Sequence, residues 1–438
     1  MKQTEALEIM KMGHNVFLTG EPGTGKTYVL TKYIEFLQKK DVPLGITAST
    51  GIAATHIDGV TIDSWSGLGI RDDISPSDIE NLKQKYHLRQ RLQKTKVLII
   101  DEISMISGKR LDMINKILKS MRNNDNAFGG MQVILSGDLF QLPPVTKNRN
   151  DIDFIFTSKA WQELDLRICY LTVPFRQKDK KLLDVLSAIR ENKVDANVVD
   201  ILKNTLTQPF EKRIIPAKLY THNIDVDGIN NQELDKLSDE SREFYMQVLG
   251  EEKLAEALKR TCLAPEILRL KKNAVVMFVR NNYEQGYVNG TMGKVMGFNH
   301  NGDPVIELYS GKKVTVVPTH WTIMDRDKII AQLTQLPLRL AWAITVHKSQ
   351  GMTLDAAELD LSKSFLLGMG YVALSRVRSL SGLRLLGFND MALRVNPLIS
   401  TIDHDLRELS SETAKNLQKM NLINKWMKRR KFMYKLTS

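Results

Sequence analysis

The octapeptide GEPGTGKT at residues 20–27 carries the most specific chemistry in the chain. It fills the spacing G-x-x-x-x-G-K-[ST] of a phosphate-binding P-loop at every required position. Backbone N–H groups can turn toward the phosphates of a nucleotide at Gly20, Gly23, Thr24 and Gly25. We expect Lys26 to meet the β- and γ-phosphates and Thr27 to ligate Mg²⁺.

The surroundings of this loop suit the same interpretation. An apolar run at residues 15–19 predicts a buried strand, and residues 28–40 carry apolar side chains at helical spacing. The helix would point the positive end of its dipole at the phosphates. A glycine-rich turn that matched the motif by chance would not need a strand before it and a helix after it. Upstream, the amide of Gln3 could pair with an adenine edge, or it could simply face solvent.

Two further apolar runs deliver polar side chains at their carboxyl ends. The run at residues 96–100 leads into Asp101 and Glu102, and carboxylates at the end of a buried strand need a cation to meet them. We expect Asp101 to hold the metal ion and Glu102 to position and polarise the attacking water. The run at residues 131–135 leads to Gln141, which could sense the γ-phosphate or, alternatively, cap the following Pro-Pro turn.

Strands that end in polar residues are typical of an open parallel sheet with its ligand at the carboxyl ends of the strands. A further such strand, at residues 44–48, leads to Thr50 and Gly51, which suit contact with a nucleic-acid phosphate. Ser64 and Trp65 follow among small residues. A tryptophan there could be a base-stacking platform, although a lone tryptophan is more often part of a core.

The composition favours a globular protein with a polyanionic partner. Its 438 residues suffice for roughly two to four domains. Lys and Arg number 62 against 50 acidic residues, a net charge of +12 that favours nucleic acid. No apolar run suits a membrane span and no signal sequence begins the chain, so we expect a cytoplasmic protein. Cys169 and Cys262 lack zinc-site spacing and are expected to be buried thiols.

The second half of the chain predicts another sheet with an insertion. A short strand at residues 217–220 leads to Thr221 and Asn223, two hydrogen-bonding residues that we assign to DNA contact. Residues 275–325 change to short alternating segments with Gly and Asn turns, which predict a small barrel.

Two other segments are predicted to be helical. Residues 71–94 form a polar insertion in the first half, with helix-start signals near residues 75–78. The end of the chain, around residues 425–431, is strongly basic with aromatic side chains interleaved. This tail could lie along a DNA backbone or dock on the second domain.

Together the motifs resemble those of superfamily-one helicases, in the Pif-one (petite integration frequency) and RecD-like branch. The segments TGEPGTGKT, TASTGIAA, IIDEISM and SGDLFQLPPV resemble motifs I, Ia, II and III, and LTVPFRQ resembles motif IV. LLDVLSAIREN resembles a segment special to the Pif-one family, while LAWAITVHKSQGMTLD and YVALSRVRS resemble motifs V and VI. The resemblance covers roughly residues 3–386.

The resemblance implies an α/β fold with two RecA-like parallel-sheet P-loop domains, a small helical insertion in the first and an SH3-like β-barrel inserted in the second. The implied segments are residues 1–65 and 95–174 for the first RecA-like domain, 66–94 for a wedge-like insertion, 175–272 and 338–400 for the second RecA-like domain, 273–337 for the barrel and 401–438 for a basic helical tail.

The resemblance also assigns residues beyond the first domain. Arg176 and Arg376 are expected to act as arginine fingers, because their planar forks suit charge spread over γ-phosphate oxygens. In the motif V loop, His347 and Ser349 are assigned to DNA, and Gln350 and Gly351 to ATP. With catalytic groups on two domains, ATP binding would close a cleft whose opening and closing drives movement.

The implied function is that of an ATP-dependent DNA helicase that uses ATP and Mg²⁺. The resemblance implies 5′ to 3′ movement on single-stranded DNA and unwinding at junctions with duplex DNA, with G-quadruplexes and RNA–DNA hybrids as further substrates. We expect a monomer. The alternative is a translocase that displaces proteins, or a recombination or repair subunit, without processive unwinding. A binding module with a degenerate P-loop is disfavoured because Lys26, Asp101 and Glu102 are all present.

Three features depart from the family pattern. Asp63 stands where the family usually has His, and a carboxylate there would repel a DNA phosphate. Glu21 and Pro22 replace the small pair often found in the P-loop. The sequence begins at the Gln3 segment without a long extension, which favours a bacterial or phage-like source.

Overall fold

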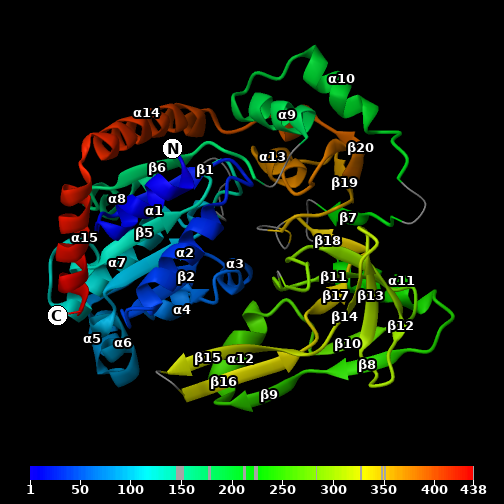
Figure 1. The fold of residues 1–438 in the computed structure, drawn as a ribbon, viewed down its shortest axis with the longest axis horizontal. Coiled ribbons are helices and arrows are strands. Elements are labelled where there is room, and N and C mark those ends of the chain that lie inside the picture. Colours follow the sequence, from blue (N-terminus) through cyan, green and yellow to red (C-terminus); the bar gives the residue numbers. More distant parts are fainter. Residues whose placement is uncertain are drawn as a thin grey trace. The chain divides into compact units, whose positions relative to one another are not determined.

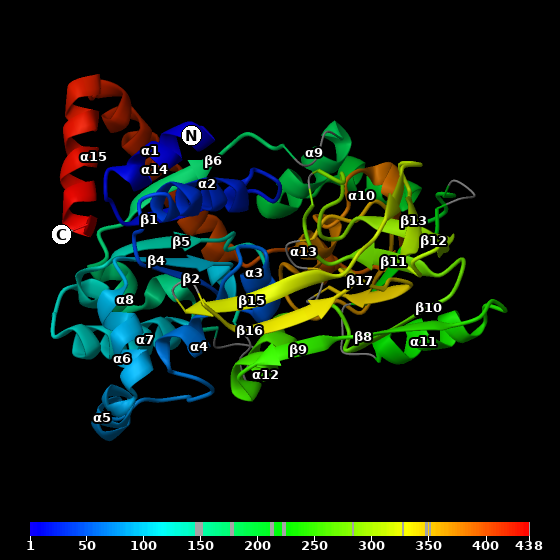
Figure 2. The same cartoon turned by 60° about the horizontal axis from the view of Figure 1, so that its bottom comes forward.

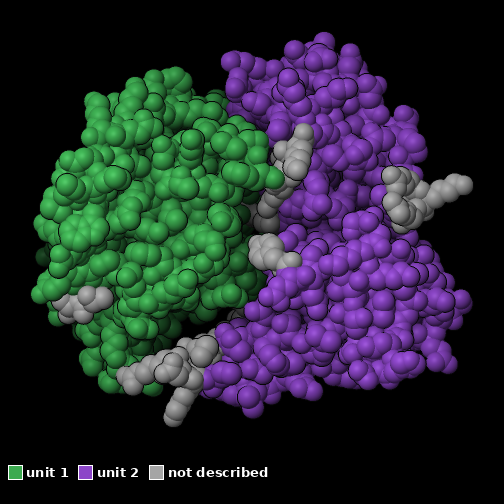
Figure 3. Space-filling view, viewed as in Figure 1, with its two compact units in different colours: residues 1–176, 396–438 green, residues 177–395 purple. Residues whose placement is uncertain are grey.

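The computed structural model describes residues 1–144, 152–175, 179–210, 214–220, 225–282, 284–325, 328–346, 349 and 352–437. The chain divides into two compact units, one of residues 1–176 and 396–438 and the other of residues 177–395 (Figure 3). The first unit therefore contains both ends of the chain. None of the helices in the described residues has the length and apolar character that crossing a membrane requires.

The first unit is built on a six-stranded parallel sheet with the order β3-β2-β4-β5-β1-β6. Figure 1 labels β1, β2, β5 and β6 of this sheet. Its strands are β1 (Val16–Gly20), β2 (Leu44–Ala48), β3 (Val60–Thr61), β4 (Val97–Asp101), β5 (Gln132–Ser136) and β6 (Arg167–Leu171). Every residue of β1, β4 and β5 is buried, because helices cover both faces of the sheet. The predicted open parallel sheet is confirmed.

Alternate residues of the strands face the two helical layers. Val16 and Leu18 of β1 belong to the core shared with α1, α2 and the C-terminal helices. Phe17 points the other way, and its ring lies edge-on to Trp161 of α8 with centroids 4.9 Å apart. The helices are α1 (Gln3–Lys11), α2 (Lys26–Gln38), α3 (Gly51–Thr55), α4 (Ile62–Ser66), α5 (Pro76–Gln84), α6 (Tyr86–Lys94), α7 (Gly108–Arg122), α8 (Lys159–Glu163), α14 (Pro397–Lys419) and α15 (Leu422–Thr437).

The polar insertion consists of α5 and α6. Ser75 caps α5: its hydroxyl accepts a hydrogen bond from the Asp78 N–H, and the Asp78 carboxylate accepts one from the Ser75 N–H. Pro76 occupies the first turn, where it costs no helical hydrogen bond. The helix start predicted from this tetrapeptide is confirmed.

The basic tail docks on the first unit, next to α1 (Figure 2). Phe432 and Leu436 of α15 join the core cluster of the first unit, and the Phe432 ring lies against Gly13. Arg429 forms an ion pair with Glu8 of α1. The alternative that the tail docks on the second domain is therefore wrong, because Phe432 and Leu436 pack into the core beside α1, a long-range contact that the sequence pattern does not reveal.

The second unit contains a four-stranded parallel sheet with the order β18-β7-β19-β20. Its strands are β7 (Ala217–Tyr220), β18 (Ala343–Thr345), β19 (Ala357–Leu361) and β20 (Leu383–Phe388). The helices of this unit are α9 (Lys180–Arg190), α10 (Ala196–Asn204), α11 (Val226–Asp235), α12 (Glu252–Thr261) and α13 (Met369–Leu374).

Antiparallel strands are inserted between β7 and β18. A five-stranded sheet has the order β14-β13-β12-β11-β17 and its own apolar core, as expected for a small inserted β-domain. A hairpin of β15 and β16 pairs with β9 instead, and β8 pairs with β10. The strands are β8 (Arg242–Tyr245), β9 (Gln247–Gly250), β10 (Ile267–Leu270), β11 (Val275–Phe278), β12 (Met292–Phe298), β13 (Pro304–Leu308), β14 (Lys313–Thr315), β15 (Thr319–Asp325), β16 (Lys328–Gln335) and β17 (Leu338–Leu340).

Replacing the buried ring of the tail tests whether α15 stabilises the first unit. We expect Phe432→Ala to lower the free energy of unfolding by about 3 kcal/mol, since it leaves a cavity beside Gly13. Tyr434→Ala removes a ring that is 75% exposed and should cost about 0.5 kcal/mol or less. Urea titration followed by circular dichroism measures both. Equal losses for the two variants would contradict the docked arrangement.

Candidate nucleotide site and nucleic-acid contacts

The P-loop joins the carboxyl end of β1 to the first residue of α2, so the octapeptide lies at the edge of the sheet where ligands bind. Lys26 Nζ donates to the carbonyl oxygens of Gly20 at 2.8 Å and Glu21 at 3.2 Å. The Thr24 hydroxyl donates to the Glu21 carbonyl at 2.8 Å. These bonds hold the lysine ammonium within the curve of the loop, where it can meet phosphate oxygens.

Gln3 is part of this site. Its Nε2 donates to the Thr24 carbonyl oxygen at 3.0 Å. A β-carbon at Gly25 would collide with the same amide, and Gly25 has a φ of +86°, which disfavours other residues. Packing against the loop accounts for one donor of Gln3, while contact of this amide with adenine stays a prediction.

The carboxylates at the end of β4 lie near the loop lysine. Strand β5 separates β1 from β4 in the sheet, and Asp101 is the last residue of β4. Burial and the neighbouring Glu102 carboxylate raise the pKa of Asp101, whereas hydrogen bonds to this carboxylate and, to a smaller extent, the positive charge of Lys26 oppose this rise. The structure thus brings Lys26, Asp101 and Glu102 into one charged cluster.

Glu102 has an unusual backbone conformation at this point. Its φ is +52°, in the left-handed region, and its N–H donates to Asp101 Oδ1 at 2.9 Å. A residue other than glycine costs about 1 kcal/mol or more in this region, and such residues concentrate at functional sites. This conformation therefore marks the end of β4 as a candidate functional turn.

Gln141 contributes a buried acceptor. Its side chain is 5% exposed, and Oε1 has no hydrogen-bond partner within the described part of the chain. A buried acceptor without a partner is costly unless a further group satisfies it. A water molecule could donate a hydrogen bond to this oxygen, whereas a phosphate oxygen, itself an acceptor, could not. The role of Gln141 toward the γ-phosphate stays a prediction.

The oxygen atoms of Asp101 and Thr27 are suitable ligands for Mg²⁺. The Asp101 carboxylate is buried at the sheet edge, and Thr27 follows Lys26 in the first turn of α2. Mg²⁺ prefers oxygen ligands and is commonly held by one or two protein groups together with substrate phosphates and water. The residues present therefore suit a nucleotide-bound Mg²⁺.

Arg407 is a residue of this site that the sequence motifs do not reveal. It lies on α14, and its Nη2 is 3.7 Å from the Glu21 carboxylate in the P-loop. Its Nε donates to Asp403 at 2.8 Å, and its guanidinium lies 4.5 Å from the centre of the Tyr170 ring. Glu21, one of the departures from the family pattern, is thus countered by a cation from the other end of the chain.

Phe175 also contacts the loop. Its backbone N–H donates to the Gly23 carbonyl oxygen at 2.8 Å. Phe175 belongs to the segment LTVPFRQ, in which the resemblance assigns a role only to the next residue. That residue, Arg176, lies outside the described residues.

Two DNA candidates of the first unit hold helix starts. Thr50 caps α3, since its hydroxyl accepts a hydrogen bond from the Ala53 N–H at 3.2 Å, and Gly51 begins that helix. Ser64 is exposed on α4. Thr50 and Gly51 follow β2 and Ser64 follows β3, and the contact of all three with DNA stays a prediction.

The base-stacking assignment of Trp65 is not supported. Its side chain is only 3% exposed and packs over Gly45 of β2, where a β-carbon would lie 2.6 Å from the ring. The absence of a side chain at Gly45 makes room for the indole inside the unit. The core alternative is therefore the correct one.

Asp63 does not present a free carboxylate to DNA. Arg110 of α7 donates to its Oδ1 at 2.6 Å, and the same guanidinium donates to the Gly69 carbonyl oxygen at 2.5 Å. This pair ties α4 and the turn after it to α7. The departure from His is thus matched by a cation within the unit, which offsets the expected repulsion of phosphate.

The described candidates of the second unit are buried within it. The Ser349 hydroxyl donates to the Val346 carbonyl oxygen at 2.8 Å, and its side chain has no exposed surface. Arg376 is 1% exposed, and its guanidinium donates to Val372 O at 3.0 Å and Ser375 Oγ at 2.8 Å. Their roles toward DNA and ATP stay predictions. The remaining candidates lie outside the described residues: Thr221, Asn223, His347, Gln350 and Gly351.

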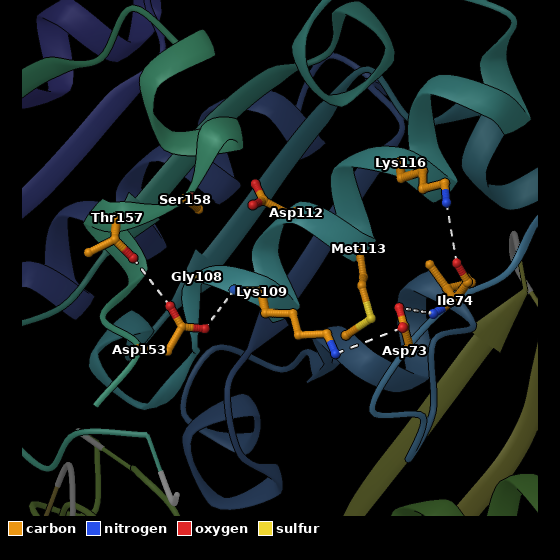
Figure 4. A pocket seen from close by; sticks show the side chains of 10 residues that line it. All are labelled: Asp73, Ile74, Gly108, Lys109, Asp112, Met113, Lys116, Asp153, Thr157 and Ser158. Atoms are coloured by element: carbon orange, nitrogen blue, oxygen red, sulfur yellow. Dashed lines mark hydrogen bonds and ion pairs between the residues drawn. The ribbon is translucent and has the colours of Figure 1, made fainter. Parts of the chain in front are cut away.

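A separate hollow of about 430 Å³ lies along α7 (Figure 4). Lys109 points toward Asp73 and Lys116 donates to the Ile74 carbonyl oxygen at 3.2 Å, so the polar side chains join the segment before α5 to α7. None of the P-loop residues lines it. We therefore interpret this hollow as a gap between α7 and the segment before α5, and not as the nucleotide site.

Comparison with known proteins decides the family. A model described as PIF1-like helicase matches residues 2–210, and one described as DNA helicase Pif1, 2B domain, matches residues 253–298. The ATP-dependent DNA helicase Pif1 of Psychrobacter sp. is 44% identical over 94% of this chain and 72% of its own length. The chain belongs to the Pif1-like family of ATP-dependent DNA helicases. It spans 60 to 64% of the length of four further relatives with that name.

Solved Pif1 structures share the fold. Pif1 of Bacteroides sp. in complex with ADP-AlF4 matches with a TM-score of 0.80 and 31% identity, over 93% of this chain and 96% of that one. Pif1 from Bacteroides in complex with ADP-AlF3 and ssDNA matches with a TM-score of 0.60 and 31% identity, over 94% and 97%. The predicted fold class, with its parallel-sheet core and an inserted antiparallel sheet, is confirmed for this Pif1-like chain.

The contact between α14 and the P-loop predicts an effect on nucleotide affinity. Arg407→Gln leaves the Glu21 carboxylate uncompensated beside the phosphates, so we expect the KM for ATP to rise about two- to fivefold, as suits a partly exposed pair. The value of kcat should change little. Steady-state ATPase assays at saturating single-stranded DNA measure both.

Two further variants separate charge from damage to the helix. Lys415→Gln removes an exposed charge of the same α14 and should leave KM unchanged. Glu21→Gln in the Arg407→Gln background should restore most of the affinity. Equal KM values for Arg407→Gln and Lys415→Gln would contradict a role for the pair.

Proposed function

We propose that this Pif1-like chain couples ATP hydrolysis to 5′ to 3′ movement along single-stranded DNA and unwinds duplex DNA at single-strand to duplex junctions. The observation that carries the proposal is the cluster of Lys26, Asp101 and Glu102 at the carboxyl edge of a buried parallel sheet. The 5′ to 3′ direction is proposed because the sequence motifs resemble those of the Pif-one family. G-quadruplexes and RNA–DNA hybrids are included as substrates on the same ground.

Each residue of the cluster has a separate task in the proposed reaction. Lys26 binds the β- and γ-phosphates, and the N–H groups of the loop bind oxygens beside it. When bound, Mg²⁺ neutralises developing phosphate charge, and Asp101 with Thr27 would hold it. Glu102 orients and polarises the attacking water, and the buried Gln141 amide accepts a hydrogen bond from that water. Arg376, with Arg176, stabilises the transition state.

Movement requires a second nucleic-acid contact whose geometry depends on the nucleotide. We assign Thr50, Gly51 and Ser64 of the first unit to the DNA backbone. Motif V and the end of β7 supply the remaining contacts, through the candidates named from the sequence. Because the two sets of DNA contacts lie in different compact units, ATP hydrolysis can change the distance between the DNA segments that they bind.

A translocase that displaces proteins from DNA without processive unwinding is the alternative function. It would use the same ATPase site, and the candidate wedge, α5 and α6, would then have no strand-separating role. A strand-displacement assay beside a streptavidin-displacement assay separates the two functions. Displacement without unwinding would favour the alternative.

Removing the catalytic groups should abolish DNA unwinding driven by ATP. We expect Lys26→Ala and Glu102→Gln each to lower the rate of ATP hydrolysis by at least about 100-fold, as for loss of a phosphate ligand or a general base. Lys32→Ala, an exposed lysine of the same helix α2, is the matched control and should keep full activity. Unwinding that persists in both site variants would contradict our assignment.

The polarity of movement is tested with two partial duplexes. A substrate with a 5′ single-stranded tail should be unwound in the presence of ATP, and one with a 3′ tail should not, because the protein must load on the tail and travel toward the junction. Gel separation of the released strand measures both. Unwinding of the 3′-tailed duplex alone would overturn the proposed direction.

A further inference from the structure

The outward surface of α15 is exposed, aromatic and basic. The inward surface of the helix is occupied, because Phe432 and Leu436 are in the core of the first unit and Arg429 pairs with Glu8. Residues on the opposite side are all exposed. We call these the outer face of α15: Ile423, Trp426, Met427, Arg430, Lys431 and Tyr434.

The charge of this helix has one sign. Its sixteen residues, LINKWMKRRKFMYKLT, include Lys425, Lys428, Arg429, Arg430, Lys431 and Lys435 and no Asp or Glu. The exposed side of the helix carries Lys428, Arg430, Lys431 and Lys435. A polyanion is the partner that such a field attracts.

The aromatic rings narrow the class of polyanion. Trp426 is 55% exposed and Tyr434 is 75% exposed, and the Arg430 guanidinium lies 5.2 Å from the centre of the Trp426 ring. Exposed rings among cations are what proteins use to stack the bases of a single strand while neighbouring charges follow its phosphates. A membrane-binding helix separates its charged face from its apolar face, whereas the outer face of α15 places Arg430 and Lys431 between its exposed apolar side chains.

The outer face is apart from the ATPase site. Phe432 lies against Gly13, which precedes the amino end of β1, whereas the P-loop follows the carboxyl end of the same strand. The assigned DNA contacts of the first unit follow β2 and β3, also at carboxyl ends. A strand bound at α15 would therefore be held at the opposite edge of the sheet.

We propose that the outer face of α15 is a second binding site for single-stranded DNA, separate from the strand on which the enzyme moves. Trp426 and Tyr434 stack bases, and Arg430 and Lys431 contact phosphates. Such a site would retain a displaced strand or a neighbouring single-stranded segment. This proposal goes beyond the helicase function, because the motor can act without it.

Two double variants of the full chain test the site without disturbing the buried side of the helix. Arg430→Gln with Lys431→Gln removes two charges, and Trp426→Ala with Tyr434→Ala removes two rings. Lys193→Gln with Lys203→Gln, two exposed lysines of the second unit, is the charge-matched control. Thermal unfolding curves of all variants should coincide with the parent curve, since none of these residues is buried.

Binding is measured by fluorescence anisotropy with labelled oligothymidylate across a salt series. A strand of about 40 nucleotides can reach several sites. With this strand, the charge variant should show a weaker salt dependence, its plot of log K against log salt being less steep by about 0.7 per lost phosphate contact. The ring variant should weaken binding about fivefold or more per ring and leave the slope unchanged. The control should match the parent protein.

A short oligothymidylate of about 8 nucleotides distinguishes the two sites. The parent protein should bind two such strands per chain, and each double variant of α15 should bind one. ATPase activity at saturating short strand should be the same in all proteins, because the motor site is intact. If single-stranded DNA failed to stimulate the ATPase activity of the parent protein, that result would instead count against the helicase function.

Three results would overturn the second site. They are an unchanged affinity and salt slope in the charge variant, an equal loss in the control, and a single bound short strand in the parent protein. Base stacking would also be overturned if the charge variant lost as much affinity for duplex DNA as for single strands while the ring variant kept the parent affinity. That result would show a contact with the duplex backbone.

Discussion

The electrostatic balance around Asp101 is the constraint on which the first unit depends. A carboxylate at the end of a fully buried strand is costly in an apolar surrounding, and the adjacent Glu102 raises the cost further. Hydrogen bonds to Asp101, including the one from the Glu102 N–H, oppose both effects, and the positive charge of Lys26 adds to that opposition. A nucleotide with its cation fits this arrangement, because it adds positive charge beside Asp101 and negative charge beside Lys26. The buried parallel sheet, in turn, keeps the groups at one edge.

Local sequence signals predicted the elements that carry this cluster. The P-loop, the apolar strands before it and after it, and the Ser75 cap are each specified by residues within a few positions of one another. Such contacts depend on backbone geometry and side-chain type, both of which a sequence pattern contains. The parallel sheet followed from several strands with polar carboxyl ends.

Features that depend on distant partners could not be predicted in the same way. The burial of Trp65 depends on Gly45 of a neighbouring strand, and a stacking platform and a core tryptophan look alike in sequence. The countercharge of Glu21 comes from Arg407, near the other end of the chain. Asp63 alone implies repulsion of a DNA phosphate, but Arg110 of α7 binds its carboxylate. In each case the deciding residue lies outside the motif.

The path of the chain has a consequence for biosynthesis. The first unit is interrupted after residue 176 and resumes at residue 396, and its main core includes Leu417, Phe432 and Leu436. A ribosome releases the amino-terminal part of this core long before the part that covers it. The nascent first unit must therefore wait with uncovered apolar side chains beside α1 while the whole second unit is synthesised, a period in which chaperone binding or misassociation would compete with folding.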